Sequence, residues 1–180
     1  MGANAIRVAG GTHHPDFYRL CDERGLIVVN DSPFVGSSSL ERKGFYDSPD
    51  FKDNGKRQLK EMIYQLYNHP SVAVWGIFSE PELRGDDPLP FIRELNATAR
   101  APDPSRLTVG VSSKDGDVNT ITDLIIWHHT LGWVEGWPSD TATGGHKIYD
   151  DPEWNNTRFP VSWRSGGSVH LKSDQPTRTR

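Results

Sequence analysis

Glu80 has the residue type and the position that point most directly to chemistry. It stands at the end of the uncharged, β-branched and aromatic run 72–78, separated from it only by Ser79, and Pro81 follows it. Such a run is typical of a strand buried on both faces, and a proline ends a strand because it has no backbone donor. Barrel enzymes carry catalytic groups at the carboxyl ends of buried parallel strands. The pattern therefore predicts that Glu80 is catalytic, and the alternative is a solvated loop glutamate, the usual state of this residue type.

The composition of the chain limits the classes of protein it can belong to. Its 180 residues are enough for one domain with a hydrophobic core, to which six Trp, seven Phe and five Tyr contribute large side chains. A net charge of −4 favours neither nucleic acid nor an anionic membrane as a partner. No stretch approaches the roughly 20 apolar residues of a transmembrane helix. The single cysteine, Cys21, excludes an internal disulfide and a multi-cysteine zinc site.

Short apolar runs alternate with helical patterns along the chain, which would place Glu80 in a sheet with helical connections. Strands are predicted at 5–8, 26–29, 72–78, 107–111 and 124–127, with a weaker one at 159–162 because of its proline. Helices are predicted at 15–24, at about 55–67 and at 89–99. Residues 36–55 are rich in Gly, Ser, Asp and Lys and are predicted to form a long surface loop. The alternation predicts a parallel sheet with right-handed crossovers.

Several motifs, taken in order, resemble glycoside hydrolase family 2, which contains β-galactosidases, β-glucuronidases and β-mannosidases. The matching segments are 1–8, 17–26, 67–72, 103–108, 121–123 and 132–133. The most specific of them is Asn68-His69-Pro70-Ser71, which leads into the strand before Glu80. The resemblance implies an α/β fold, namely an incomplete (β/α)8 TIM barrel with roughly strands two to seven. This partial barrel domain is expected over residues 1–171, with a polar tail at 172–180.

The resemblance also implies an activity and a partner. It points to a glycosidase that hydrolyses the O-glycosyl bonds of β-galactosides or related β-glycosides by a retaining mechanism with two carboxylates. Glu80 matches the acid/base residue, which protonates the leaving oxygen and later activates water. Burial beside Trp75 and Phe78 is expected to raise the pKa of Glu80 toward the useful range. A carbohydrate substrate and other domains of a longer parent chain are the expected partners, and neither a cofactor nor a catalytic metal is implied.

Substrate contacts are expected at Arg7, Ser79, Trp127, His128 and Trp133. Ser79 and His128 each stand where the family has an asparagine, and the asparagine at position 79 holds the 2-hydroxyl of the sugar. Trp133 offers an aromatic face on which a sugar ring can stack. Arg7 matches a family arginine near the pocket, and the alternative for it is a structural ion pair.

The position of the family's nucleophile departs from the pattern. Its flanking residues match, but Trp163 stands where the second glutamate is expected, followed by Arg164. Neither side chain can form the covalent glycosyl ester, and a retaining enzyme needs two carboxyl groups about 5–5.5 Å apart. Glu135 and Glu153, in predicted loops, are alternative sources of the second carboxylate.

Two other functions are compatible with these residues. A non-catalytic remnant could bind carbohydrate through its tryptophans and Arg7 without hydrolysing it. A metal-dependent barrel hydrolase could use the paired histidines at 13–14 and 128–129. A catalytic zinc site needs three protein ligands supported by further polar groups, so paired histidines alone do not define one.

Overall fold

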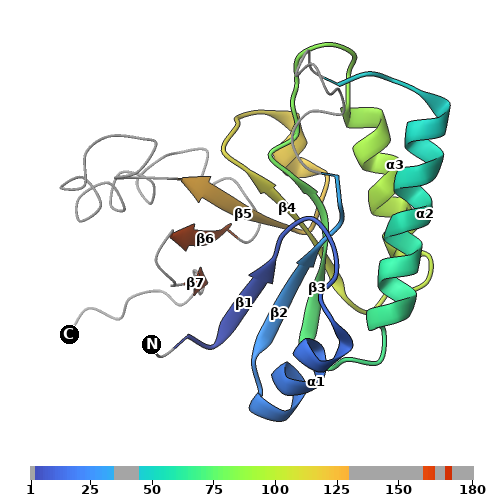
Figure 1. The fold of residues 1–180 in the computed structure, drawn as a ribbon. Helices are drawn as coiled ribbons and strands as arrows, with labels where there is room; N and C mark the ends of the chain where they lie inside the picture. The colour runs from blue at the N-terminus through green and yellow to red at the C-terminus, as the bar shows by residue number, and fades with distance from the viewer. Residues whose placement is uncertain (1–2, 35–44, 130–159, 165–168, 172–180) are drawn as a thin grey trace, which may run out of the picture.

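The computed structural model describes residues 3–34, 45–129, 160–164 and 169–171, and these residues form one seven-stranded sheet. The strands lie in the order of the chain (Figure 1). They are β1 (Ala5–Val8), β2 (Ile27–Asp31), β3 (Val72–Ser79), β4 (Leu107–Ser112), β5 (Leu124–His129), β6 (Pro160–Arg164) and β7 (Val169–Leu171). Strands β1 to β6 pair in parallel, each with the next, and β7 pairs antiparallel with β6. The six predicted strands are thus present, and β7 is an addition that the sequence pattern did not indicate.

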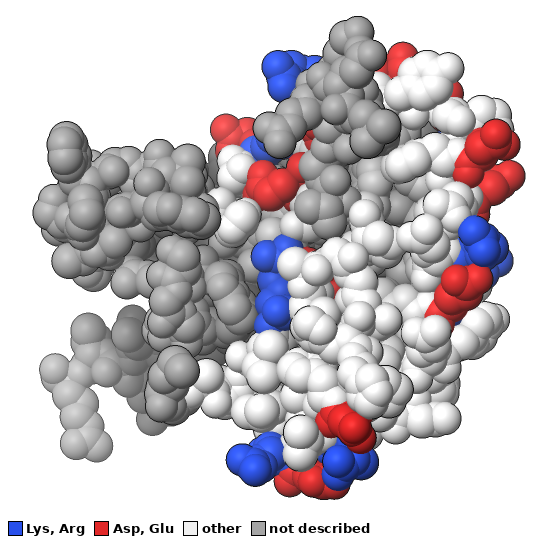
Figure 2. Space-filling model, in the orientation of Figure 1, with Lys and Arg blue, Asp and Glu red and all other residues white. Residues whose placement is uncertain are grey.

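Helices connect the parallel strands. They are α1 (Pro15–Arg24), α2 (Pro49–Leu66), α3 (Leu89–Arg100) and the short 3-10 helix η1 (Asp117–Thr120). Figure 1 shows α2 and α3 lying side by side along one face of the sheet. Among the residues that the structure describes, no helix is long and apolar enough to cross a membrane. On the face drawn in Figure 2, acidic and basic side chains are interspersed, so no field of a single sign covers it.

The ends of α1 and α2 show which local signals were predictive. Helix α1 begins at Pro15 and stops at Gly25, whose φ of 64° is the left-handed conformation expected after a helix. Helix α2 begins six residues earlier than predicted, with Pro49 in its first turn, so the loop predicted at 36–55 was wrong for residues 49–55. Gly55 lies inside this helix, where a Cβ would come within 2.9 Å of the Phe91 ring, so the packing of α2 favours glycine at this position. Residues 35–44 lie outside the described part of the chain.

The two faces of the sheet carry separate apolar clusters. The face under the helices holds the larger core, which includes Trp75, Ile77, Phe78 and Trp127. The opposite face holds a smaller cluster of Val29, Val109, Val111 and Ile126. Successive residues of a strand point to opposite faces, so residues two positions beyond Val29 or Ile126 share the face of the smaller cluster. Because the strands are parallel, their carboxyl ends lie at one edge, where Asp31, Glu80 and His128 stand.

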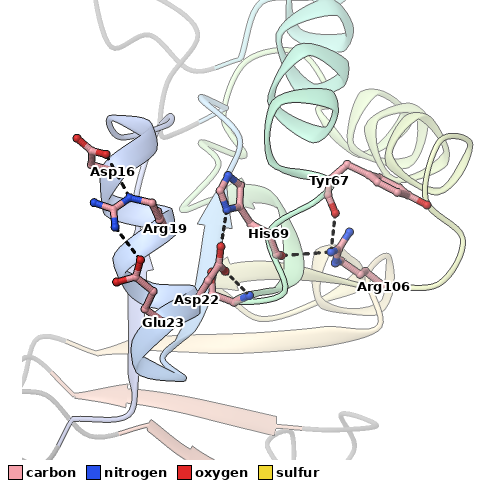
Figure 3. A network of polar contacts seen from close by, with 8 residues as sticks. Asp16, Arg19, Asp22, Glu23, Tyr67, His69 and Arg106 are labelled. Carbon is pink, nitrogen blue, oxygen red and sulfur yellow. Dashed lines mark hydrogen bonds and ion pairs between the residues drawn. The ribbon is translucent and has the colours of Figure 1, made fainter.

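The Asn-His-Pro-Ser segment fixes the amino end of β3 rather than the site itself. His69 Nδ1 lies 2.6 Å from Asp22 Oδ2, and the Ser71 N–H donates to Asp22 Oδ1 at 2.9 Å, so α1 is tied to the start of β3. Arg106 donates to the backbone carbonyls of Tyr67 and His69 from the other side (Figure 3). Eight residues of β3 separate this end from Glu80, about 26 Å at the usual strand rise. The motif therefore positions Glu80 at a distance, through the strand.

Replacing Asp22 by asparagine is expected to lower the free energy of unfolding by about 1–2 kcal/mol at pH 7, measured by urea denaturation. Burial works against the Asp22 carboxylate, but the bonds from Ser71 and His69 outweigh it and lower its pKa. A carboxylate whose pKa is lowered by folding stabilises the fold at pH values above its unfolded pKa. That stabilisation is lost as the pH falls through the folded pKa. The difference in unfolding free energy between parent and variant should therefore narrow as the pH falls below the unfolded pKa of aspartate.

The control for this variant is Glu23→Gln, which removes the neighbouring, exposed carboxylate. Glu23 bonds only to Arg19 within α1 among the contacts that the structure describes. An exposed pair of this kind contributes little, so a change within about 0.5 kcal/mol is expected. Equal destabilisation by the two variants would contradict the claim that Asp22 stabilises the fold by joining α1 to the start of β3.

Candidate active site

Glu80 directly follows β3 in a backbone conformation that is uncommon for its residue type. Its φ is 49°, the one positive φ of a non-glycine residue within the described residues. The left-handed region costs a residue with a side chain roughly 1 kcal/mol, and such costs often mark functional sites. Two backbone bonds hold this turn: the Glu80 N–H donates to the Val111 carbonyl at 2.8 Å, and the Ser79 N–H donates to the Phe34 carbonyl at 3.0 Å. The carboxyl group is therefore aimed by its neighbours and not by a flexible loop.

The Glu80 carboxylate contacts groups from two other segments. Its Oε2 accepts a hydrogen bond from Ser113 Oγ, just after β4, at 2.7 Å. His128 Nδ1, on β5, lies 3.5 Å from Oε1, an ion-pair distance that does not meet hydrogen-bond geometry. Within the described residues, Oε1 is buried and accepts no hydrogen bond. The side chain as a whole is 24% exposed, so solvent and small molecules can reach part of it.

The expected rise in the pKa of Glu80 is wrong. Burial does raise it, but the interactions with His128 and Ser113, together with the charge of Lys114, outweigh burial and lower the pKa below its usual value. Trp75 and Phe78 do not surround the carboxyl group, because both side chains are buried in the core under the helices. The polar partners of Glu80 therefore set its pKa.

Arg7, Asp31 and Ser79 form a polar cluster beside Glu80. Arg7 Nε donates to Asp31 Oδ2 at 2.8 Å, and its NH2 donates to Ser79 Oγ at 2.6 Å. The Asp31 side chain is fully buried and that of Arg7 is 11% exposed. Burial raises the pKa of Asp31 to about 6, against the opposing charge and hydrogen bond of Arg7. The alternative of a structural ion pair for Arg7 is thus present in the structure, and the Ser79 hydroxyl is bound by it.

Sequence reasoning missed two residues of this site, Asp31 and Ser113. Asp31 ends an apolar parallel strand just as Glu80 follows one, so the same signal was available. Ser113 lies in a polar loop, and no sequence signal distinguishes it from the neighbouring Ser112.

The structure bears on one of the two tryptophan predictions, that for Trp127. Trp127 is only 6% exposed and belongs to the core under the helices, on the opposite face of β5 from Ile126, so its placement argues against a sugar contact. Trp133 lies outside the described residues, as do Glu135 and Glu153. The backbone of β6 is described, and it sets Trp163 in register with His128 of β5. The position of the expected nucleophile therefore adjoins the strand that carries His128.

The paired histidines do not form a metal cluster in the part of the chain that the structure describes. His14 Nδ1 accepts a hydrogen bond from the Asp16 N–H at 3.3 Å and so caps α1. The His13 ring packs against Phe17, with ring centroids 4.9 Å apart. Within the described residues, no group of three or more His, Cys, Asp or Glu side chains could hold a metal ion. The described part of the chain therefore gives no support to a metal-dependent hydrolase.

Comparison with known proteins places this arrangement in a family. The family model for the TIM barrel domain of glycosyl hydrolases family 2 matches residues 1–153. A β-glucuronidase of Bacteroides fragilis is 44% identical over 97% of this chain, which covers 25% of that protein. A putative β-glucuronidase of Formosa agariphila is 33% identical over 95% of the chain and 20% of its own length. The chain therefore spans about a quarter of the length of these relatives, or less.

A solved structure supports the same placement. The FMN-binding β-glucuronidase from Facaelibacterium prausnitzii L2-6 superposes with a TM-score of 0.71 at 31% sequence identity. The match covers 84% of this chain and 24% of that one. The predicted fold, part of a TIM barrel, is confirmed, while the boundary predicted at residue 171 stays a prediction. Six parallel strands in chain order and a family model that covers most of the sequence show that this chain belongs to the TIM barrel domain of the family 2 glycosyl hydrolases.

Proposed function

We propose that this chain carries the acid/base half of a β-glycosidase site and that the protein acts on β-glucuronides. The observation that carries the proposal is the Glu80 carboxylate, one-quarter exposed after β3, with Ser113 on one oxygen and His128 beside the other. The relatives described above are named β-glucuronidases, and this moves the proposed sugar from galactose to glucuronic acid. Family membership supports β-glycoside hydrolysis as the reaction class.

In the proposed reaction, the protonated Glu80 gives its proton to the glycosidic oxygen as the bond from that oxygen to the anomeric carbon breaks and a second carboxylate, for which Glu135 and Glu153 are the candidates, bonds to that carbon. The Glu80 carboxylate then takes a proton from the water that displaces this second carboxylate from the sugar. Arg7 holds the Ser79 hydroxyl at 2.6 Å and so fixes the residue before Glu80. Ser113 fixes the rotation of the carboxyl group. Sugar recognition is assigned to residues beside Glu80. His128 is proposed to contact the sugar, and Trp133 is proposed to stack on the sugar ring.

A second candidate, a carbohydrate-binding remnant without turnover, is favoured by one specific observation. Trp163 occupies the position at which a retaining enzyme of this family needs its second carboxylate. A tryptophan cannot form the glycosyl ester, although it can contact a sugar. The two candidates differ in whether the anomeric bond is ever broken.

The proposed function is tested with 4-nitrophenyl β-D-glucuronide and the matching galactoside, each with and without sodium azide. Release of nitrophenol from the glucuronide, with or without azide, is expected to be at least about tenfold faster than its release from the galactoside. Turnover that needs azide, with a glucuronyl azide of inverted configuration as the product, would show that the chain supplies the acid but no nucleophile. Turnover without azide would assign the second carboxylate to this chain, with Glu135 and Glu153 as the residues to substitute. Binding of glucuronate without release of nitrophenol under either condition would establish the remnant instead.

A further inference from the structure

We propose that His128 is a positioning residue for the Glu80 carboxylate, an assignment that rests on the acid/base role proposed above. It reaches Glu80 from β5, across the intervening strand β4, with Nδ1 3.5 Å from Oε1. The family resemblance implies an asparagine at this position, which carries no charge. An imidazole beside the acid/base group is therefore a feature of this chain's own sequence.

The unsatisfied oxygen of Glu80 indicates what His128 does. Oε2 already accepts from Ser113, whereas Oε1 is buried and accepts no hydrogen bond from the described residues. Buried carboxylate oxygens normally have a donor. A hydrogen bond needs a nitrogen–oxygen distance of about 2.7–3.2 Å, so a shift of a few tenths of an ångström would let His128 Nδ1–H donate to Oε1. Ser113 and His128 would then hold the carboxylate from both oxygens.

Charged groups from two other strands and one loop interact with Glu80, with His128 or with each other. Asp31 on β2 is attracted by His128 as well as by Arg7 on β1, which binds it directly. The charge of Lys114, in the loop after β4, also lowers the pKa of Glu80. The backbone of that loop is fixed, because the Lys114 N–H donates to Ser112 Oγ at 3.0 Å and its carbonyl accepts from Asn119 at 2.6 Å. His128 thus interacts electrostatically with two carboxylates, Asp31 and Glu80, and lowers the pKa of both.

This arrangement has a definite consequence for the reaction. The interaction with His128 lowers the pKa of the Glu80 carboxyl group. The acid step needs the protonated form, and that form is lost as the pH rises through the pKa. His128 therefore moves the alkaline limit of activity to lower pH, and it favours the carboxylate that serves as base in the second step.

The test is a titration of the Glu80 carboxyl group by NMR in protein labelled with [13C]glutamate, with Glu80→Gln used to assign its signal. In the His128→Asn variant the titration midpoint is expected to move upward, toward that of an exposed glutamate. His128→Gln serves the same purpose if the asparagine variant does not fold. His14→Asn is the matched control, because it removes an exposed histidine at the start of α1, where asparagine is also a good helix cap. This control should leave the midpoint unchanged.

The result that overturns the inference is a Glu80 midpoint that is the same in the parent and in both His128 variants. The titration needs no turnover, so it decides the role of His128 even if the chain releases no nitrophenol. Conversely, hydrolysis with an unchanged midpoint would leave the proposed function standing and remove His128 from it. Where the chain is active, the alkaline limb of its pH–rate profile should move upward in His128→Asn and stay in place in His14→Asn.

Discussion

Replacing Glu80 by glutamine is expected to lower kcat/KM for 4-nitrophenyl β-D-glucuronide by about 10²–10⁴-fold, under whichever azide condition the parent chain turns over. Glutamine keeps the shape of the side chain and can still accept from Ser113 Oγ, so the protein should remain folded. It cannot donate a proton to the leaving oxygen or accept one from water. Steady-state rates of nitrophenol release measure the effect.

The control for this substitution is Glu82→Gln, two residues further along. Glu82 bonds to the guanidinium and backbone of Arg84 and contacts neither Ser113 nor His128 in the described structure. The Glu82→Gln substitution removes one negative charge close to Glu80. It therefore separates the effect of a general change of charge from the effect of losing the acid/base group. A change of less than about threefold is expected for Glu82→Gln, and comparable losses in the two variants would contradict the assignment.

Replacing Asp103 by asparagine is expected to lower the free energy of unfolding by about 3 kcal/mol at pH 7, the largest stability effect of the substitutions considered. Asp103 is fully buried and accepts from Trp75 Nε1 at 3.0 Å and from Arg106 NH1 at 2.7 Å. It also accepts from the Ser105 backbone and hydroxyl. Asparagine would leave Arg106 without its counter-charge and place an amide donor against other donors. Urea denaturation monitored by tryptophan fluorescence measures the change.

The pH dependence of this effect has a definite sign. Burial raises the pKa of Asp103, but the bonds from Ser105, Arg106 and Trp75 outweigh it and hold the pKa well below its usual value. The stabilisation is therefore complete above the unfolded pKa and is lost as the pH falls below it. Asp53→Asn is the matched control, since that carboxylate on α2 is exposed and pairs only with Lys56 among the described residues. A change within about 0.5 kcal/mol is expected for the control, and a similar small change in Asp103→Asn would contradict the role of this cluster.

The strands and the position of Glu80 could be predicted because they depend on local patterns, whereas the order of the strands followed from the family resemblance. Uncharged runs of β-branched and aromatic residues mark the buried strands, and Glu80 stands where the longest of them ends. The start of α2 could not be predicted in the same way. Gly55 and the surrounding polar residues are typical of a loop, whereas in the structure the Phe91 ring, from another helix, leaves no room for a side chain at this position of α2.

The parts of the site that local patterns did not reveal depend on contacts between distant segments. The pKa of Glu80 takes its direction from Ser113 and His128, which reach it only after β4 and β5 have been placed in the sheet. Asp31 becomes a site residue through Arg7 on the neighbouring strand. Trp127 lies in an apolar run that gives no sign of which face of β5 the helices cover. The Glu80 pKa, the role of Asp31 and the burial of Trp127 all depend on how the strands pair in the sheet, which the local sequence pattern does not show.

Whether Glu80 protonates the leaving oxygen is tested most directly by comparing leaving groups in the Glu80→Gln variant. The phenol of a phenyl glucuronide is a poor leaving group and needs a proton. The 2,4-dinitrophenol of the corresponding dinitrophenyl glucuronide leaves readily without one. If Glu80 is the acid, the substitution lowers kcat/KM for the phenyl substrate by about 10²–10⁴-fold and for the dinitrophenyl substrate far less. Equal losses for the two substrates, or no loss for either, would contradict the assignment of Glu80 as the proton donor.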